Sequence, residues 1–483
     1  MAFLIFAIMG SPVAVAASAQ PPATADRPGC AELARSDLSK LRDAPAIILS
    51  ARLVKPAAGV PNYCEVKGYG WRNVEFRVRF PIERWNGKLV VFGTGGQAGS
   101  IDVDDPVIRD SRTGAALRKG YATAEHNGGH LSGGLDAQWS YDNESALLDY
   151  GFRAPHVAGL VAREIVRRAF NSPAVRVYYS GCSNGGREAL QMAQKYPYEY
   201  DGIIAAAPSL FWSDQFVALG WAGRRFAGPN PVLNDAALRT LHAAVIAQCD
   251  HLDGRRDAIL EDPRRCRPDL AKIACQAKAE SGCLTQDQIR VAQEIYDGPR
   301  TPEGKVIASS SAMPGSELTW STFSIVGPYS DSVMRFQTFT PPAGPDFVPD
   351  ENQLADYVRR AGASDAIIAA TNPDLRRFKA NGGKLLSFMG WSDAIGGIAA
   401  TIDYYRTVER LMGGRKDTQD FYRLFMIPGM NHCTGGDGAY DVDWLDILDA
   451  WVSRDVAPDV VRAVHPDADG KPVFSREIKP FVD

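Results

Sequence analysis

The sequence lacks a long apolar stretch, and neither sign of charge dominates it. Residues 3–9 form an apolar run that is too short to cross a hydrocarbon core of about 30 Å, and no other segment is long and apolar enough to do so. The 53 lysines and arginines are balanced by 57 aspartates and glutamates, which leaves a net charge of −4 at pH 7. Because no basic surface is indicated, we expect neither nucleic acid nor a membrane as a partner.

Histidine is also scarce: 7 occur in 483 residues, so few side chains can exchange a proton near neutral pH. In contrast, 45% of the residues are hydrophobic and 10% are aromatic, which is enough to bury a large core. The chain is longer than one ordinary domain. We therefore expect a globular protein with two lobes.

Two features predict export. The apolar run is followed by the small residues Ala17, Ser18 and Ala19, which resemble a cleavage site, so residues 1–19 are predicted to be a signal peptide although no lysine or arginine precedes the run. A membrane anchor is the alternative, which the shortness of the run disfavours. The even number of cysteines, 8, suits an oxidising compartment. We expect a secreted or periplasmic protein.

Strand and helix patterns alternate from about residue 70 onward. Strands are predicted over 74–80, 88–92, 121–125, 175–180, 202–207, 384–389 and 422–427, and helices over 150–170, 184–195, 396–412 and 442–452. This alternation is typical of an α/β protein with a mostly parallel sheet covered on both faces. It lapses over residues 211–371, which hold four cysteines, many prolines and glycines, and scattered aromatics. We predict an α/β domain formed by residues 20–210 and 372–483, with 211–371 as an inserted lid domain.

The strongest chemical signal is a G-x-S-x-G motif over residues 181–185, centred on Ser183. It follows a predicted buried strand and opens a predicted helix. Glycines at such a junction allow the sharp turn that lifts a serine hydroxyl clear of the sheet edge. Ser183 is therefore predicted to be the nucleophile of an α/β-hydrolase fold, and a glycine-rich turn without a catalytic serine is the alternative.

A serine nucleophile needs a base and a carboxylate that orients the base, in the chain order Ser, Asp or Glu, His. His432 lies in a glycine-containing loop directly after the predicted strand 422–427, and Asp393 directly follows the strand 384–389. Asp417 and Asp420 also lie between the two motifs, but they precede a strand and would lie at the opposite sheet edge. We predict a triad of Ser183, Asp393 and His432.

Cysteines adjoin both ends of this triad. If Ser183 and His432 meet, the Cα atoms of Cys182 and Cys433 can come within the about 4.4–6.8 Å that a disulfide needs. Two buried free thiols are the alternative. The remaining cysteines are closer in sequence and favour local pairs, Cys30 with Cys64, Cys249 with Cys266, and Cys275 with Cys283.

Acyl transfer also requires backbone N–H groups that stabilise the oxyanion. The amide of Asn184, the residue after the nucleophile, is one candidate. The second is expected from the glycine-rich turn after the strand 88–92, where Gly95 and Gly96 are the candidates. A phosphate-binding loop is the competing interpretation, but the turn lacks the lysine and the spacing of a P-loop.

A second group of chemically useful residues lies in the inserted segment. Asp250, Asp253 and Asp257 surround a glycine turn and offer hard oxygen ligands, and the carbonyl groups of Arg255 and Ile259 could complete a calcium shell. The spacing is not that of an EF-hand, because the glutamate at its twelfth position is missing. A solvated acidic turn is the alternative.

Taken together, these motifs resemble the tannase and feruloyl esterase family over nearly the whole mature chain. The most specific marks are the Cys182-Ser183 and His432-Cys433 pairs, which that family joins by a disulfide, and the Asp-x-x-Asp-Gly-x-x-Asp calcium loop. The resemblance implies hydrolysis of esters of aromatic acids, a lid domain and a structural calcium ion. It also implies, more weakly, that Arg335 and Phe339 hold the substrate's free carboxylate and ring.

We therefore expect a secreted serine carboxylic ester hydrolase that cleaves small aromatic esters, such as feruloyl or galloyl esters, through an acyl-enzyme on Ser183. One alternative is an enzyme like mono(hydroxyethyl) terephthalate hydrolase, which belongs to the same family. Others are a general carboxylesterase or lipase and a serine peptidase. The non-enzymatic alternative is a calcium-stabilised binding protein with a decayed site.

Overall fold

The computed structural model describes residues 28–56, 59–101, 111–228, 230–276, 282–308 and 312–483. The predicted signal peptide, residues 1–19, lies outside the described residues. No helix within the described ranges is long and apolar enough to cross a membrane.

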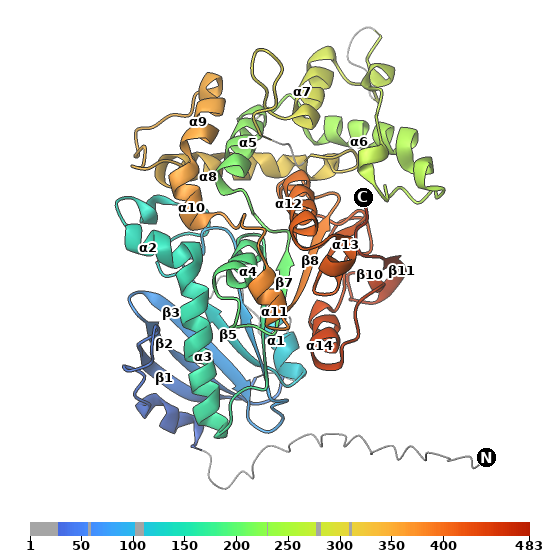
Figure 1. Ribbon diagram of the computed structural model, residues 1–483. Coiled ribbons are helices and arrows are strands. Elements are labelled where there is room, and N and C mark those ends of the chain that lie inside the picture. Colours follow the sequence, from blue (N-terminus) through green and yellow to red (C-terminus); the bar gives the residue numbers. More distant parts are fainter. Residues whose placement is uncertain (1–27, 57–58, 102–110, 229, 277–281, 309–311) are drawn as a thin grey trace, which may run out of the picture.

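A mixed sheet of nine strands forms the centre of the molecule, in the order β1-β2-β3-β5-β4-β6-β7-β8-β9. The strands from β5 to β9 run parallel, whereas β1, β2 and β3 pair antiparallel at one end (Figure 1). The bounds are β1 Ala46–Val54, β2 Tyr63–Gly70, β3 Val74–Pro81, β4 Lys88–Phe92, β5 Ala122–His126, β6 Arg176–Cys182, β7 Gly202–Ala206, β8 Lys384–Gly390 and β9 Tyr422–Ile427. The predicted mostly parallel sheet is confirmed.

The parallel strands are apolar because helices cover both of their faces. Strand β7 is an example, since all of its residues are buried. One face packs against α3 (Ala154–Phe170), α4 (Asn184–Lys195) and α12 (Ile398–Leu411). The other packs against α1 (Arg112–Arg118) and α14 (Trp444–Arg454). This is the layered arrangement of the α/β-hydrolase type.

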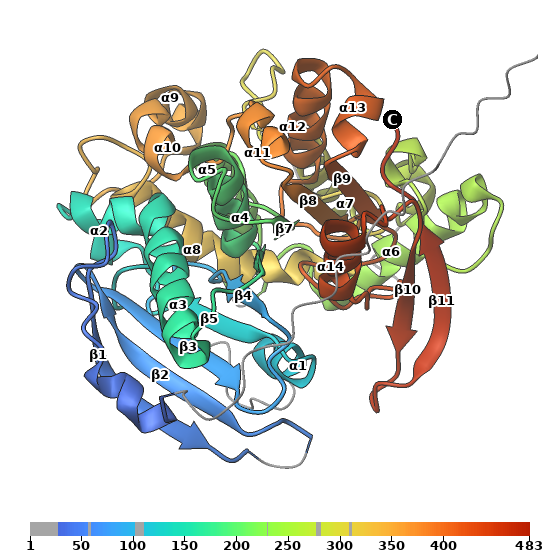
Figure 2. The same ribbon diagram turned by 60° about the horizontal axis from the view of Figure 1, so that its bottom comes forward.

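Four strands were not predicted. Strands β1 and β2 extend the sheet antiparallel to β3, and β10 (Val461–Pro466) and β11 (Pro472–Ile478) form a separate hairpin. Figure 2 shows this hairpin at the opposite end of the molecule from β1, β2 and β3. The apolar pattern is weak in β11, where most side chains are exposed, whereas β1 is apolar in sequence even though several of its large side chains are exposed.

Residues 211–371, inserted between the adjacent strands β7 and β8, are mainly helical and lie above the carboxyl ends of the parallel strands (Figure 1). Their helices are α5 Trp212–Arg225, α6 Asp235–Cys249, α7 Gln286–Asp297, α8 Phe323–Phe336, α9 Leu354–Arg360 and α10 Gly362–Ile368. Helices α5 and α8 pack closely because glycines face each other: a Cβ atom on Gly223 would lie 2.3 Å from the Cα of Gly327. Buried aromatics, including Trp212 and Trp320, form a core of their own.

The remaining helices are short. They are α2 Glu144–Leu148, α11 Arg376–Ala380 and α13 Arg415–Gln419. All eight cysteines are paired, as predicted, in the disulfides Cys30–Cys64, Cys182–Cys433, Cys249–Cys266 and Cys275–Cys283. Two of these bridges lie within the inserted segment. The Cys182–Cys433 bridge links the turn that holds Ser183 to the loop that holds His432.

Candidate active site

Ser183 occupies a strained turn between β6 and α4. Its φ of 62° and ψ of −123° are rare for a residue with a side chain, and such a conformation costs about 1–3 kcal/mol. Glycines make the turn sterically possible, since a Cβ atom on Gly181 would lie 2.3 Å from the carbonyl oxygen of Gly185, and one on Gly186 2.1 Å from that of Ala206. The geometry is that of a nucleophile elbow.

Asp393 and His432 meet at the same edge of the sheet, each in the loop after its strand. The Nδ1 atom of His432 lies 2.7 Å from Oδ2 of Asp393. Asp393 is fully buried, and its other oxygen accepts a hydrogen bond from the backbone N–H of Ile395 at 3.1 Å. A buried carboxylate at this nitrogen keeps a proton on Nδ1, which leaves Nε2 free to act as a base.

The electrostatics of His432 are set by two opposing effects. Burial lowers the pKa of His432, but the charge of Asp393 and the hydrogen bond to it raise this pKa by more, so that it lies above the ordinary value of 6.5. The ring is therefore a stronger base than a free imidazole. Such an environment suits a side chain that must accept a proton from a serine hydroxyl.

The disulfide between Cys182 and Cys433 ties the serine turn to the histidine loop. It joins residues 251 positions apart, with 5.9 Å between their Cα atoms. Because the bridge connects the immediate neighbours of Ser183 and His432, it holds both side chains at one rim of the sheet. The two side chains line the same small pocket, whose volume is about 40 Å³.

Helices of the inserted segment complete this pocket, which we call the Ser183 pocket. Besides Ser183 and His432, its lining consists of Gly96, Asn184, Ser209, Trp212, Gln215, Phe216, Leu219, Val326, Tyr329 and Ile395. The ring of Phe216 packs against Trp212 and Tyr329, with centroids 4.6 and 4.8 Å apart. Trp212 is one of the scattered aromatics of the inserted segment, whereas Phe216 and Tyr329 were not predicted, although Trp212, Phe216 and Leu219 recur at helical spacing along α5.

The structure brings two of the three predicted oxyanion residues to this pocket. Asn184 is the first residue of α4, where a backbone N–H has no acceptor within the helix. Gly96 lines the pocket, while Gly95 is not among the lining residues. The carbonyl of Gly96 accepts a hydrogen bond from the hydroxyl of Tyr150 at 2.7 Å, which fixes the orientation of this turn.

Glu188, a fully buried carboxylate that was not predicted, connects the two segments in which oxyanion donors are predicted, the turn of Gly95 and Gly96 and the start of α4. Its oxygens accept hydrogen bonds from the N–H and the hydroxyl of Thr94 at 3.0 and 2.8 Å, and from the side chain of Asn184 at 3.1 Å. Tyr179 donates to it at 2.9 Å. The turn that contains Gly96 is thereby fixed to the first turn of α4.

Arg187, also fully buried, connects the same helix to neighbouring segments. It donates to the side-chain oxygen of Asn184 at 2.8 Å and to the carbonyl oxygens of Tyr150, Gly151 and Ile368 at 2.8, 2.6 and 2.9 Å. A buried cation satisfied by carbonyl groups in this way makes removal of any partner costly. Asn184 is consequently held from both sides.

The predicted calcium residues lie in the loop after α6, inside the Cys249–Cys266 disulfide. The Oδ1 atom of Asp250 is buried and has no hydrogen-bond partner. Asp253 accepts a hydrogen bond from the N–H of Arg255 at 2.8 Å, and Asp257 pairs with Arg476. Among the residues that the structure describes, no three or more His, Cys, Asp or Glu side chains lie close enough together to hold a metal ion.

Arg255 and Ile259, whose carbonyl groups were predicted to complete the calcium shell, lie within the same loop. Ile259 is buried, and its N–H donates to Asp257 at 3.3 Å, whereas Arg255 is exposed. A buried carboxylate oxygen without a donor, as on Asp250, is the environment that a bound cation satisfies. The unpaired oxygen of Asp250 is thus the one observation in favour of a cation here, whereas Asp257 is already paired with Arg476.

Arg335 and Phe339 do not reach the Ser183 pocket. The Nε of Arg335 donates to the carbonyl oxygen of Phe347 at 2.9 Å. Phe339 is buried in an aromatic cluster, with its ring centroid 5.4 Å from that of Phe347 and 5.5 Å from that of Tyr357. Neither residue is among those that line the pocket.

Comparisons with known proteins agree with this geometry. The chain is 31% identical over 480 residues to an uncharacterized esterase of Xanthomonas campestris, covering 89% of this chain and 82% of that protein. It is 30% identical over 488 residues to the mono(2-hydroxyethyl) terephthalate hydrolase of Piscinibacter sakaiensis, covering 84% and 79% of the two chains.

The fold is shared with solved structures. The crystal structure of feruloyl esterase B from Aspergillus oryzae superposes with a TM-score of 0.81 at 24% identity, covering 94% of this chain and 96% of that one. The family model described as tannase and feruloyl esterase matches residues 59–347 and 346–479. The chain therefore belongs to the tannase and feruloyl esterase family.

Proposed function

We propose that this protein is a serine carboxylic ester hydrolase that cleaves esters of aromatic acids, such as feruloyl or galloyl esters, through an acyl-enzyme on Ser183. The observation that supports this most is that His432, which lines the same pocket as Ser183, is hydrogen-bonded to Asp393 behind it. Family membership supports the same class of reaction.

In the first half of the proposed reaction, the hydroxyl of Ser183 attacks the ester carbonyl while Nε2 of His432 takes its proton. The hydrogen bond from Nδ1 to Asp393 stabilises the imidazolium that forms. The tetrahedral intermediate collapses when His432 returns the proton to the leaving alcohol. Water then attacks the acyl-enzyme, again with His432 as base, and releases the acid.

The negative charge that develops on the carbonyl oxygen is assigned to two backbone donors. The amide of Asn184 is one, and the amide of Gly96 is preferred over that of Gly95 because Gly96 lines the pocket. Preorganised donors of this kind are typically worth about 2.7–4 kcal/mol each. Their segments are fixed to each other through Glu188.

An aromatic acyl group is favoured by the lining from the inserted segment. Trp212, Phe216 and Tyr329 present ring surfaces toward the pocket, and offset or edge-to-face ring contacts add about 0.5–1.5 kcal/mol beyond the area that they bury. We propose that residues 211–371 serve as the lid that holds the substrate ring above Ser183.

We also propose a structural calcium ion in the loop after α6. Asp250, Asp253, Asp257 and the carbonyl groups of Arg255 and Ile259 would hold it, and the cation would neutralise carboxylates that lie close in sequence. Adding EDTA is expected to lower the melting temperature, and calcium to restore it. In Asp250→Ala neither addition should change the melting temperature, and an EDTA effect of equal size there would contradict this site.

Export to an oxidising compartment is proposed on the four disulfides and the predicted signal peptide. The activity itself is tested by measuring the release of acid from methyl ferulate, methyl gallate and mono(2-hydroxyethyl) terephthalate by the wild type and by Ser183→Ala. We expect wild-type hydrolysis of at least one aromatic ester and its loss in the variant. Equal activity in both, or no hydrolysis by either, would refute the proposal.

A further inference from the structure

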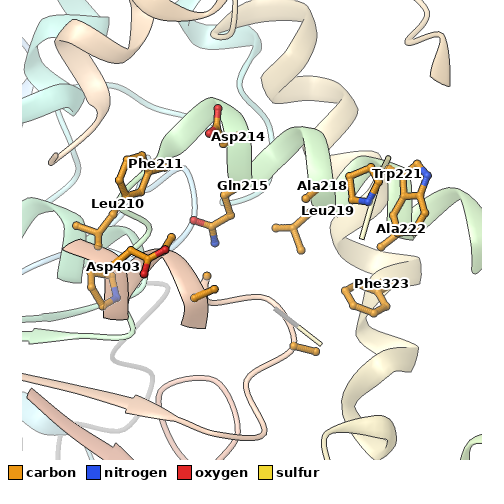
Figure 3. A pocket seen from close by; sticks show the side chains of 16 residues that line it. Leu210, Phe211, Asp214, Gln215, Ala218, Leu219, Trp221, Ala222, Phe323 and Asp403 are labelled. Carbon is orange, nitrogen blue, oxygen red and sulfur yellow. The ribbon is translucent and has the colours of Figure 1, made fainter. Parts of the chain in front are cut away.

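A larger cleft adjoins the Ser183 pocket and has no role in the reaction described above. We call it the side cleft: it has a volume of about 220 Å³ and lies between α5 and the first turn of α12. Figure 3 shows Phe211, Leu219 and Trp221 along its α5 wall, with Phe323 of α8 at one end and Asp403 at the other. Its walls are mostly apolar or aromatic.

The side cleft and the Ser183 pocket share a wall. Gln215 and Leu219 line both spaces, and the loop after Asp393 contributes Ala394 to the side cleft and Ile395 to the Ser183 pocket. The side-chain amide of Gln215 donates to the carbonyl oxygen of Ile395 at 2.6 Å. The two spaces are therefore neighbours, separated by Gln215 and Leu219, and movement of the Gln215 side chain away from Ile395 would join them.

The charged groups of the side cleft are all acidic. Asp214 and Asp403 line it. Asp403 forms an ion pair at 3.0 Å with Arg406, which is not a lining residue. Among the described residues, no lysine or arginine lines either the side cleft or the Ser183 pocket. A substrate carboxylate placed here would be desolvated beside Asp214 without a cation to balance it, which is strongly unfavourable.

We propose that the side cleft is a second substrate subsite, which is reached past Gln215, receives the far, uncharged end of the aromatic acyl group and rejects a free carboxylate. This assignment rests on the proposed function and narrows its substrate class. An enzyme that acts on half-esters of dicarboxylic acids must accept a free carboxylate, whereas this chain is expected to disfavour such substrates.

If the charge of Asp214 causes the rejection of a carboxylate, the rejection should depend on pH. A cleft that rejects the carboxylate by its shape alone would show no such dependence. Burial raises the pKa of Asp214 to about 6, with a further contribution from the charge of Asp365 on α10. Asp403 on α12 lines the same cleft. Discrimination against an anionic substrate should therefore be strongest above pH 6 and should weaken as Asp214 becomes protonated.

A matched pair of substrates tests the subsite. Methyl 4-carbamoylbenzoate and monomethyl terephthalate carry the same single ester, and they differ only in an amide or a carboxylate at the far side of the ring. For the wild type at pH 8 we expect kcat/KM to be at least about tenfold higher for the amide, since one unbalanced like charge is worth about 1.4 kcal/mol or more in such a site. The ratio should fall at pH 5, where titration of His432 slows both substrates alike.

Variants of the wall sharpen the test. Asp214→Asn should reduce the ratio at pH 8 and remove its dependence on pH, and Leu219→Arg should raise kcat/KM for monomethyl terephthalate relative to the amide. Asp469→Asn, an equal charge change at an exposed site in the β10–β11 turn, should retain the wild-type ratio. If Asp214→Asn does not fold, the pH dependence of the wild-type ratio still decides the matter.

The outcomes separate the two proposals. A wild-type ratio near one at pH 8, with both activities lost in Ser183→Ala, would overturn the subsite and leave the esterase intact. Cleavage of methyl ferulate but of neither benzoate would also overturn the subsite, because the cleft is large enough for the far end of either acyl group. Hydrolysis that persists in Ser183→Ala would instead refute the proposed function.

Discussion

The sheet and the inserted segment 211–371 meet at the Ser183 pocket, but they fix their side chains by different means. On the sheet side, Ser183, Asp393 and His432 each lie in the turn or loop that follows a strand, and a disulfide and a hydrogen bond join these segments. On the inserted side, Phe216 and Tyr329 reach the pocket through the packing of α5 against α8. In the proposed function, the reaction chemistry would thus depend on local backbone geometry, and substrate recognition on helix packing.

This difference predicts a division of kinetic effects. Changes on the sheet side should lower kcat, because they disturb groups that act on the transition state. Changes on the inserted side should mainly raise KM, because they remove contacts that bind the substrate ring.

The largest effect is expected for Asp393→Asn. An amide would favour the wrong tautomer of His432 and could not stabilise the imidazolium, so kcat should fall by about 10⁴-fold with a small change in KM. Steady-state kinetics on methyl ferulate would measure this. Asp417→Asn, an equal change at the opposite sheet edge, serves as the control, and a similar loss there would contradict the assignment.

Glu188→Gln tests whether the sheet side depends on the buried link between the oxyanion segments. The variant keeps the shape of the side chain but cannot accept all of the hydrogen bonds from Thr94, Asn184 and Tyr179. A small displacement of the oxyanion donors should lower kcat by about ten- to a hundredfold and change KM little. A rise in KM at unchanged kcat would show that Glu188 acts on binding instead.

On the inserted side, Phe216→Ala should raise KM for methyl ferulate by about tenfold, because the ring contact between the protein and the substrate is lost. The value of kcat should change much less. Methyl acetate, which has no ring, provides the control substrate. If kcat for methyl ferulate fell as strongly as in Asp393→Asn, the proposed division between the two regions would be wrong.

The smallest effect concerns pH. His432 must be neutral to accept the proton of Ser183, and its pKa is raised above 6.5 by Asp393 despite burial. The kcat/KM of the wild type should therefore decline as the pH falls through a midpoint above 6.5. Residual activity of Asp393→Asn should decline at a lower pH, and an acid limb that is unchanged by the substitution would contradict the coupling.

The sheet side could be predicted from the sequence because its signals are local. The turn at Ser183 lies between a mostly buried strand and a helix, and Asp393 and His432 follow strands that are almost entirely buried. Parallel strands end at one edge, so placing each residue after its strand was enough to bring them together. The disulfide between Cys182 and Cys433 followed from the same reasoning.

The inserted side could not be predicted in the same way. Phe216 and Tyr329 are 113 positions apart, and only the packing of their helices brings their rings to the pocket. Glu188 was missed for a related reason. Its carboxylate accepts a hydrogen bond from Thr94, which lies 94 positions earlier in the chain. Arg335 was predicted to bind a substrate carboxylate, but it donates a hydrogen bond to the backbone carbonyl of Phe347. Its place in an aromatic segment of the sequence did not indicate this contact.

If Ser183 is an activated nucleophile, an organophosphate ester should modify it covalently. The protein would be treated with diethyl 4-nitrophenyl phosphate, and the modified residue located by peptide mass spectrometry while esterase activity is followed. We expect loss of activity in step with one diethylphosphoryl group per chain on Ser183, with much slower labelling in Asp393→Asn. Inactivation with the label on another residue, or full activity after Ser183 is labelled, would contradict the account.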